Sequence, residues 1–281
     1  MAGNPLINNM TKPQGDPRFG QFGAGGTTTA SNPYGQQAPY GQPVSAEQLN
    51  QMYTAPAATP VDTNRITIND IIVKTGLNFG LVLVAAVIAW QFPILMFVGL
   101  VGGLVLGFVN ALKKQVSPAL VMTYSVMEGF LVGGLSLFFE ASYPGIVVQA
   151  VLATVIVFGT ILALFSSGKI RATAKLTRFF MVAAISYTVF CLVNLVTSMF
   201  FDFNARSVEV MGIPLGLIIG LFAVLLATYS LLLDFTHASE AIKSGLPERE
   251  SWRIAFGLVV SLVWLYIEIL RVIYYIRSMA D

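Results

Sequence analysis

The chain of 281 residues is short of the residue types that most metal and enzyme sites need. It has one cysteine and one histidine, so a cluster of Cys or His metal ligands is excluded and no intrachain disulfide can form. The patterns Gly-x-Ser-x-Gly and Gly-x-x-x-x-Gly-Lys are missing too, and with them the usual marks of a serine hydrolase and of a phosphate-binding loop. The sequence therefore predicts neither a conventional enzyme nor a resident cofactor.

Charged residues are scarce as well. They make up 11% of the chain, against about 25% in a typical soluble domain, and the mean hydropathy is +0.74. Three runs contain no Asp, Glu, Lys or Arg, namely 76–112, 141–168 and 179–201. About 20 apolar residues are enough to cross the hydrocarbon of a bilayer. The chain is therefore predicted to be an integral membrane protein, with the lipid bilayer as its first partner.

Residues 1–64 differ in composition from everything that follows. They are rich in Gly, Pro and Gln and repeat the motif Pro-Tyr-Gly-Gln at 33–36 and 39–42. Too few aliphatic side chains are present to offset the entropy cost of ordering this segment, which predicts a disordered tail. A flexible tail without a dedicated ligand is the favoured interpretation. The formal net charge of +2 gives no indication of a nucleic-acid partner.

Residues 65–281 are predicted to form one seven-helix transmembrane domain. The apolar segments lack the two-residue alternation of barrel strands, so helices are left as the way to satisfy the backbone in lipid. Thr67 and Asp70 have the spacing of a capping box at the start of the first helix. The expected helices cover about 69–91, 94–112, 118–140, 146–166, 179–201, 213–235 and 254–276. The fold class is thus an all-α membrane bundle.

The distribution of Lys and Arg predicts the orientation of this bundle. With seven crossings, eleven of them fall on the side of the N-terminal tail: Arg65, Lys74, Lys113, Lys114, Lys169, Arg171, Lys175, Arg178, Lys243, Arg249 and Arg253. Arg206 and Arg277 fall on the opposite side. Because basic loops stay in the cytoplasm, the N-terminus is expected to be cytoplasmic and the C-terminus extracytoplasmic.

Four ionisable residues are expected at membrane depth, namely Glu128, Asp234, Glu268 and Arg271. A charge at mid-bilayer costs at least about 2.5–3.5 kcal/mol, so such groups normally face the bundle interior and pair. Glu268 and Arg271 are three residues apart on one helix and could form an ion pair. Asp234 and Glu268 could meet if the sixth and seventh helices are antiparallel neighbours.

Two carboxyl groups in one water-poor site cannot both ionise cheaply, so they are expected to share a proton. Loss of that proton would push the helices apart or admit a cation, which predicts a pH-responsive cation path. The alternative is a static polar lock between helices. Glu128, with Tyr124 one turn earlier, either lines the path or is a structural carboxyl that the tyrosine satisfies. His237 could tune Asp234, although a structural histidine at the interface is favoured.

Three motifs occur in a fixed order, namely Glu128-Gly129, the segment Tyr229-Ser-Leu-Leu-Leu-Asp234, and Leu265-Tyr-Ile-Glu268. Together they resemble the Bax inhibitor-1 family, also called the transmembrane Bax inhibitor motif or YccA-like family. The likeness covers about residues 69–279. The tyrosine-containing tail followed by Thr-Ile-Asn-Asp-Ile-Ile-Val-Lys-Thr-Gly is similar to the branch found in actinobacteria, which implies a bacterial cell membrane.

The resemblance implies six helices around a central seventh and a pH-sensitive calcium leak gated by a carboxylate pair. By motif position that pair corresponds to Asp234 and Glu268, which would also be the transient calcium ligands, carboxylate oxygen being what calcium prefers. The chain departs from the family in having Glu at 268, where Asp is usual, and in the long connection that contains Pro247–Glu250. In some relatives an arginine near the cytoplasmic end of the second helix binds the first acid of the pair and acts as a latch. The only charges of this chain at the matching position are Lys113 and Lys114.

A second function belongs to a different class. Some bacterial relatives inhibit a membrane-bound AAA+ protease through a cytoplasmic N-terminal tail, and the long polar tail of this chain would permit such a regulatory role. A third possibility, an intramembrane hydrolase, finds no assembled nucleophile or metal site in the sequence. A calcium leak and a protease inhibitor are therefore the two functions that the resemblance implies.

Overall fold

The computed structural model describes residue 50 and residues 64–280 of the chain. The tail predicted for residues 1–64 lies outside the described residues, apart from its positions 50 and 64. Everything below concerns the unit that begins after this tail.

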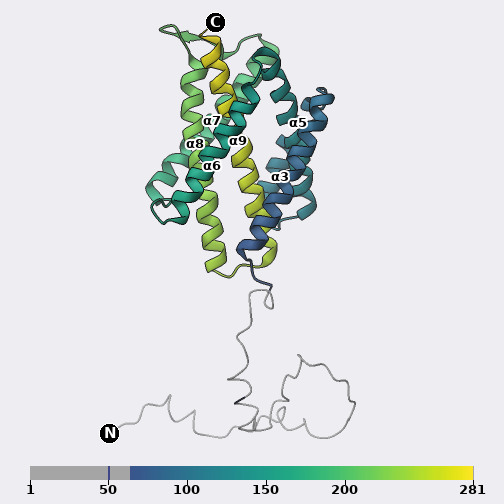
Figure 1. Ribbon diagram of the computed structural model, residues 1–281, viewed down its shortest axis with the longest axis vertical. Coiled ribbons are helices and arrows are strands. Elements are labelled where there is room, and N and C mark those ends of the chain that lie inside the picture. The colour runs from purple at the N-terminus through teal and green to yellow at the C-terminus, as the bar shows by residue number, and fades with distance from the viewer. Residues whose placement is uncertain (1–49, 51–63, 281) are drawn as a thin grey trace, which may run out of the picture. The chain divides into compact units, whose positions relative to one another are not determined.

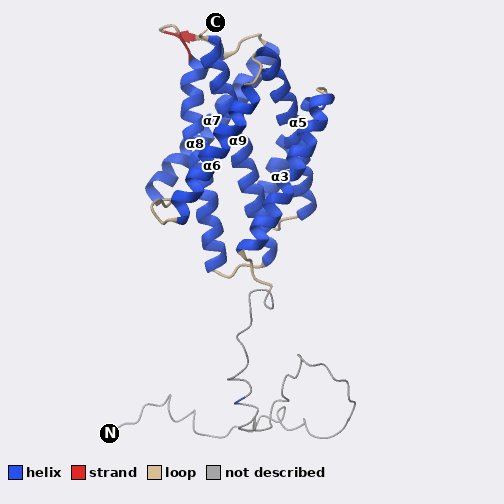
Figure 2. Ribbon diagram, in the orientation of Figure 1, coloured by secondary structure: helices blue, strands red, loops and turns tan. Residues whose placement is uncertain are grey.

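Seven long helices make up this unit, and all seven are long and apolar enough to cross a membrane (Figure 2). They are α3 (Ile68–Gln91), α4 (Leu95–Leu112), α5 (Pro118–Ser142), α6 (Ile146–Ser166), α7 (Ala174–Phe200), α8 (Leu215–Lys243) and α9 (Ser251–Ser278). The 3-10 turn η2 (Ala205–Ser207) and the strands β1 (Glu209–Val210) and β2 (Ile213–Pro214) connect α7 to α8, and η3 (Glu248–Glu250) precedes α9. The predicted seven-helix membrane fold is confirmed.

The bundle has two ends, because successive helices run in opposite directions (Figure 1). We call the end where α3 begins the N-face and the end where α9 finishes the C-face. At the N-face the chain entering α3 pairs with the α8–α9 connection, where the Ile66 N–H donates to the Leu246 carbonyl at 2.8 Å. Lys74 reinforces this contact through Glu248 at 2.7 Å. The first and the last helix are therefore tied together at one end.

Helix α9 is the central element. In the most apolar segment of α9, 50% of the residues are buried, whereas the corresponding value for α7 at the periphery is 11%. Helix α9 packs on α3, α5, α6 and α8. In Figure 1 it lies between α8 and α6 on one side and α3 on the other. Leu258, Leu265 and Leu270 of α9 enter the main core together with Leu231 of α8. The central seventh helix that the resemblance implied is confirmed.

Small residues let α3 and α5 approach closely. A Cβ atom on Gly133 would lie 2.2 Å from the Ala86 carbonyl oxygen, and one on Gly129 would lie 2.4 Å from the Val82 carbonyl oxygen. Only glycine fits at such backbone-to-backbone contacts, as is typical of tightly packed membrane helices.

The helix ends follow hydrogen bonding rather than hydropathy. The capping box at Thr67 and Asp70 is present as predicted. Helix α7 begins at Ala174, five residues earlier than expected, because the Thr173 hydroxyl caps the Leu176 N–H. Helix α8 continues eight residues past 235 and ends before Gly245, which has φ 61°. A helix that leaves the bilayer can continue in water. The loss of apolar residues therefore predicted a start of α7 that is too late and an end of α8 that is too early.

Candidate functional site

Helix α9 carries polar groups on one side within the otherwise apolar bundle. Ser261 and Glu268 are buried and seven residues apart, so they lie on the same side of the helix, separated by about 10 Å along its axis. Gly257 is one turn before Ser261 on that side. Ser261 contacts a residue of α8, whereas Glu268 contacts a residue of α7. Two separate polar clusters therefore lie along α9, and we call them stations.

The first station contains Asp234 of α8. The Ser261 hydroxyl donates to Asp234 Oδ2 at 2.5 Å, and the Ser230 and Ser261 hydroxyls are 2.7 Å apart. A Cβ atom on Gly257 would lie 2.9 Å from Asp234 Oδ1, so the absence of a side chain there makes room for the carboxylate. We call Asp234, Ser230 and Ser261 the aspartate station; it offers oxygen atoms only.

The second station surrounds Glu268, whose side chain is 3% exposed. Glu268 Oε1 accepts a hydrogen bond from the Tyr187 hydroxyl of α7 and another from Arg271 Nη1 at 2.8 Å. The ion pair expected between Glu268 and Arg271 is present. A second guanidinium adds to it, because Arg206 Nη1 lies 3.7 Å from Glu268 Oε2. We call Glu268, Arg271, Arg206 and Tyr187 the glutamate station.

Arg206 is the residue that the sequence did not reveal as part of the site. It belongs to the short turn η2, yet its side chain is buried, and its Nη2 donates to the Tyr187 hydroxyl at 2.7 Å. Asn204 caps the turn by accepting from the Arg206 N–H, and Asn194 of α7 binds Asn204 in turn. Burial alone would lower the pKa of Arg206, but Tyr187 and Glu268 beside it raise that pKa above the ordinary value. The guanidinium is therefore charged.

Trp264 lies on α9 between Ser261 and Glu268 in the sequence. Its ring stacks on Tyr187 of the glutamate station, with centroids 5.7 Å apart and an interplanar angle of 25°. Within the part of the chain that the structure describes, no hydrogen bond or ion pair joins Asp234 to Glu268. The expectation of two adjoining carboxylates sharing a proton is thus not met, because each acid has polar partners of its own.

The remaining predicted residues lie apart from both stations. Glu128 accepts from the Tyr124 hydroxyl at 2.6 Å and faces Gly103 of α4, which agrees with the structural alternative for this acid. His237 is exposed, and no hydrogen bond to Asp234 is found for it between residues 64 and 280.

The two candidate latch residues, Lys113 and Lys114, are exposed. Their backbone carbonyls accept hydrogen bonds from Arg253 of α9. Neither ammonium group contacts Asp234 in the described residues, so the latch role that was carried over from the family finds no structural support.

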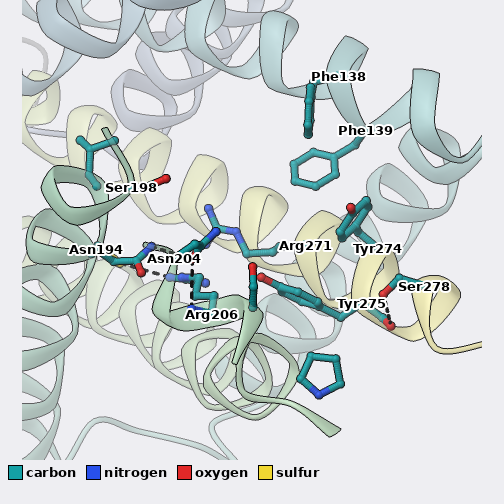
Figure 3. A pocket seen from close by; sticks show the side chains of 14 residues that line it. Phe138, Phe139, Asn194, Ser198, Asn204, Arg206, Arg271, Tyr274, Tyr275 and Ser278 are labelled. Carbon is teal, nitrogen blue, oxygen red and sulfur yellow. Dashed lines mark hydrogen bonds between the residues drawn. The ribbon is translucent and has the colours of Figure 1, made fainter. Parts of the chain in front are cut away.

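A cavity of about 550 Å³ opens beside the glutamate station at the C-face. Figure 3 shows Arg206 and Arg271 between Asn194 and Asn204 on one side and Tyr275 on the other. Among the described residues that line this cavity, Arg206 and Arg271 are the only charged ones. No group of three or more His, Cys, Asp or Glu residues that could hold a metal ion occurs in residues 64–280.

Comparison with known proteins identifies the family of the chain. No curated protein matches the chain. A family model described as Bax inhibitor 1 like matches residues 16–278, a range that contains all seven membrane helices. The chain therefore belongs to the Bax inhibitor 1 like family of membrane proteins.

Proposed function

We propose that the protein is a pH-sensitive leak pathway for cations, with calcium as the first candidate, along the side of α9 that carries Ser261 and Glu268. The observation that supports this proposal most directly is that two carboxylate groups, Asp234 of α8 and Glu268 of α9, are bound along the same side of the central helix. Ionisable groups inside a membrane domain normally mark an ion or proton route. The oxygen atoms of the aspartate station also support the proposal, because hard cations such as calcium prefer oxygen ligands.

The aspartate station is the part that responds to pH. When Asp234 is ionised, its carboxylate and the hydroxyls of Ser230 and Ser261 offer oxygen ligands to a passing cation. When Asp234 is protonated, the station has no net charge and holds a cation poorly. The leak is therefore expected to rise as the pH rises through the titration of Asp234.

The conformation described here corresponds to a closed pathway. Trp264, three residues after Ser261 on α9, stacks its ring on Tyr187 of the glutamate station. At that station one carboxylate faces two guanidinium groups, so the station carries an excess positive charge that repels cations. Opening requires that the rings separate and that Glu268 exchanges at least one arginine for the ion.

The test is calcium flux from liposomes that contain the purified full chain, measured from acidic to mildly alkaline pH. Asp234→Asn removes the titrating group, so its leak at alkaline pH should fall by about tenfold, the equivalent of about 1.4 kcal/mol, and should no longer depend on pH. The control is Glu240→Gln, which changes an exposed acid on the same helix and should leave the flux unchanged. A wild-type pH profile in Asp234→Asn would refute the proposal.

The regulatory alternative rests on residues 1–64, which lie almost wholly outside the described part of the chain. Deletion of residues 1–60 separates the two functions. A leak through the bundle persists without the tail, whereas an inhibitor that acts through the tail loses its protease. Loss of protease binding on deletion, together with no leak from the intact chain, would favour the alternative.

A further inference from the structure

The cavity at the C-face contains two positive charges and has only one negative charge beside it. Arg206 and Arg271 both line it, and both have Glu268 as their carboxylate partner. The Tyr187 hydroxyl donates to Glu268 and is therefore a neutral phenol. One positive charge at this site has no counterpart among the described residues.

An uncompensated charge out of bulk water is costly, and a bound ion of opposite sign offsets that cost. The side chain of Arg206 is 6% exposed and that of Arg271 is 23% exposed. Arg271 donates one hydrogen bond, from Nη1 to Glu268, and its other N–H groups have no hydrogen-bond partner among the described residues. Arg271 also lines the cavity. Guanidinium groups in this position favour phosphate and carboxylate oxygens, which accept two parallel hydrogen bonds.

The remaining walls fit a group that is polar at one end. Asn194, Asn204 and Ser198 lie on the polar side of the cavity, and Phe138 and Phe139 lie on the opposite side (Figure 3). Phe138 is 61% exposed on the surface of the bundle, so the apolar wall continues to the lipid-facing side.

We propose that this cavity is a binding site for a phosphate group, supplied either by free phosphate or by the headgroup of an anionic lipid, with Arg271 as the principal ligand and Arg206 beside it. The site shares Arg206, Arg271 and Glu268 with the proposed leak pathway, but it does not rest on that function, because it requires only the charge imbalance at Glu268. It lies toward the C-terminal end of α9, whereas Ser261 of the aspartate station lies nearer the start of that helix.

The experiment uses the full chain in nanodiscs of phosphatidylcholine and measures the thermal unfolding midpoint as inorganic phosphate is added, with chloride at equal ionic strength as reference. A parallel set of nanodiscs contains phosphatidylglycerol, and native mass spectrometry records whether that lipid stays bound. If free phosphate is the ligand, added phosphate should raise the unfolding midpoint. If the lipid headgroup is the ligand, phosphatidylglycerol should raise the midpoint and remain bound in the mass spectrum.

Arg271→Gln removes one charge and leaves Arg206 to balance Glu268, so the variant is expected to fold. Its apparent affinity for the active ligand should fall by about tenfold, and Arg271→Lys should recover part of it. Arg277→Gln is the matched control, because Arg277 is at the same face and binds the Pro144 carbonyl outside the cavity. The proposal is overturned if neither ligand shifts the wild type, or if Arg271→Gln responds as Arg277→Gln does.

Discussion

At the scale of single residues, Glu268 is held by partners from three parts of the chain. Arg271 comes from its own helix, Tyr187 from α7 and Arg206 from the turn η2. A buried carboxylate needs such partners, because an ion without them loses its hydration and gains nothing in return. Arg206 is buried and Arg271 is half-buried, and both have Glu268 as their one carboxylate partner in the described residues. Removal of Glu268 should therefore destabilise the station more than removal of either arginine.

This asymmetry gives a prediction about stability. Glu268→Gln leaves two guanidinium groups together without a carboxylate and should lower the free energy of unfolding by about 3 kcal/mol. Arg271→Gln leaves one charge of each sign and should change it by less than about 1 kcal/mol. Thermal unfolding in detergent, at low phosphate, measures both.

The double variant Glu268→Gln with Arg271→Met supplies the control. It removes one charge of each sign and should recover part of the stability that Glu268→Gln loses. Equal losses for Glu268→Gln and Arg271→Gln would mean that the charge imbalance at this station does not exist.

The sequence predicted the Glu268–Arg271 pair because a spacing of three on one helix fixes the contact locally. It did not predict Arg206, since a charge in a short connection looks the same whether it faces water or folds back into the bundle. The sequence indicates a turn at this point, because Asn204, two residues before Arg206, is a good cap residue. No residue near it indicates that Arg206 contacts Tyr187 or Glu268.

At the scale of helices, the α8–α9 hairpin explains why Asp234 and Glu268 do not meet. Helix α8 ends at Lys243 and α9 begins at Ser251, so residues at similar distances from this short connection face each other. Asp234 is nine residues before Lys243 and Ser261 is ten residues after Ser251, whereas Glu268 is seventeen residues after it. The motifs alone do not predict which residues of α8 and α9 face each other, because the pairing depends on where the two helices end and begin.

Helix packing gives a second prediction. Gly133→Ala places a methyl group against the Ala86 backbone, so α3 and α5 must move apart, and overpacking of this kind costs about 1–3 kcal/mol. Gly159→Ala is the matched control, because a Cβ atom there meets nothing within 4 Å. Thermal unfolding of the two variants should differ clearly; identical midpoints would show that the α3–α5 contact tolerates the added carbon.

At the scale of the whole molecule, the seven spans were predictable because burial in lipid depends on the length and polarity of each segment, not on its neighbours. The structure adds that several basic residues belong to helix ends rather than to loops. Lys175 and Arg178 lie in the first turns of α7, and Lys243 lies in the last turn of α8. These basic side chains lie at the N-face. The rule that Lys and Arg near membrane spans favour the cytoplasmic side therefore applies to them as it does to residues in loops.

That charge distribution predicts the orientation of the protein, which cysteine labelling can test. In a Cys191→Ser background, which removes the one native cysteine, a single new cysteine is placed at either face. Met211→Cys lies in the β1–β2 turn at the C-face, where Met211 is 97% exposed, and a membrane-impermeant maleimide should label it in intact cells. Lys243→Cys at the N-face is expected to react only after the membrane is permeabilised, because a face with eleven Lys and Arg residues is predicted to be cytoplasmic. The opposite pattern would place the aspartate station toward the outside, and acidification of the exterior, rather than of the cytoplasm, would then reach Asp234 first.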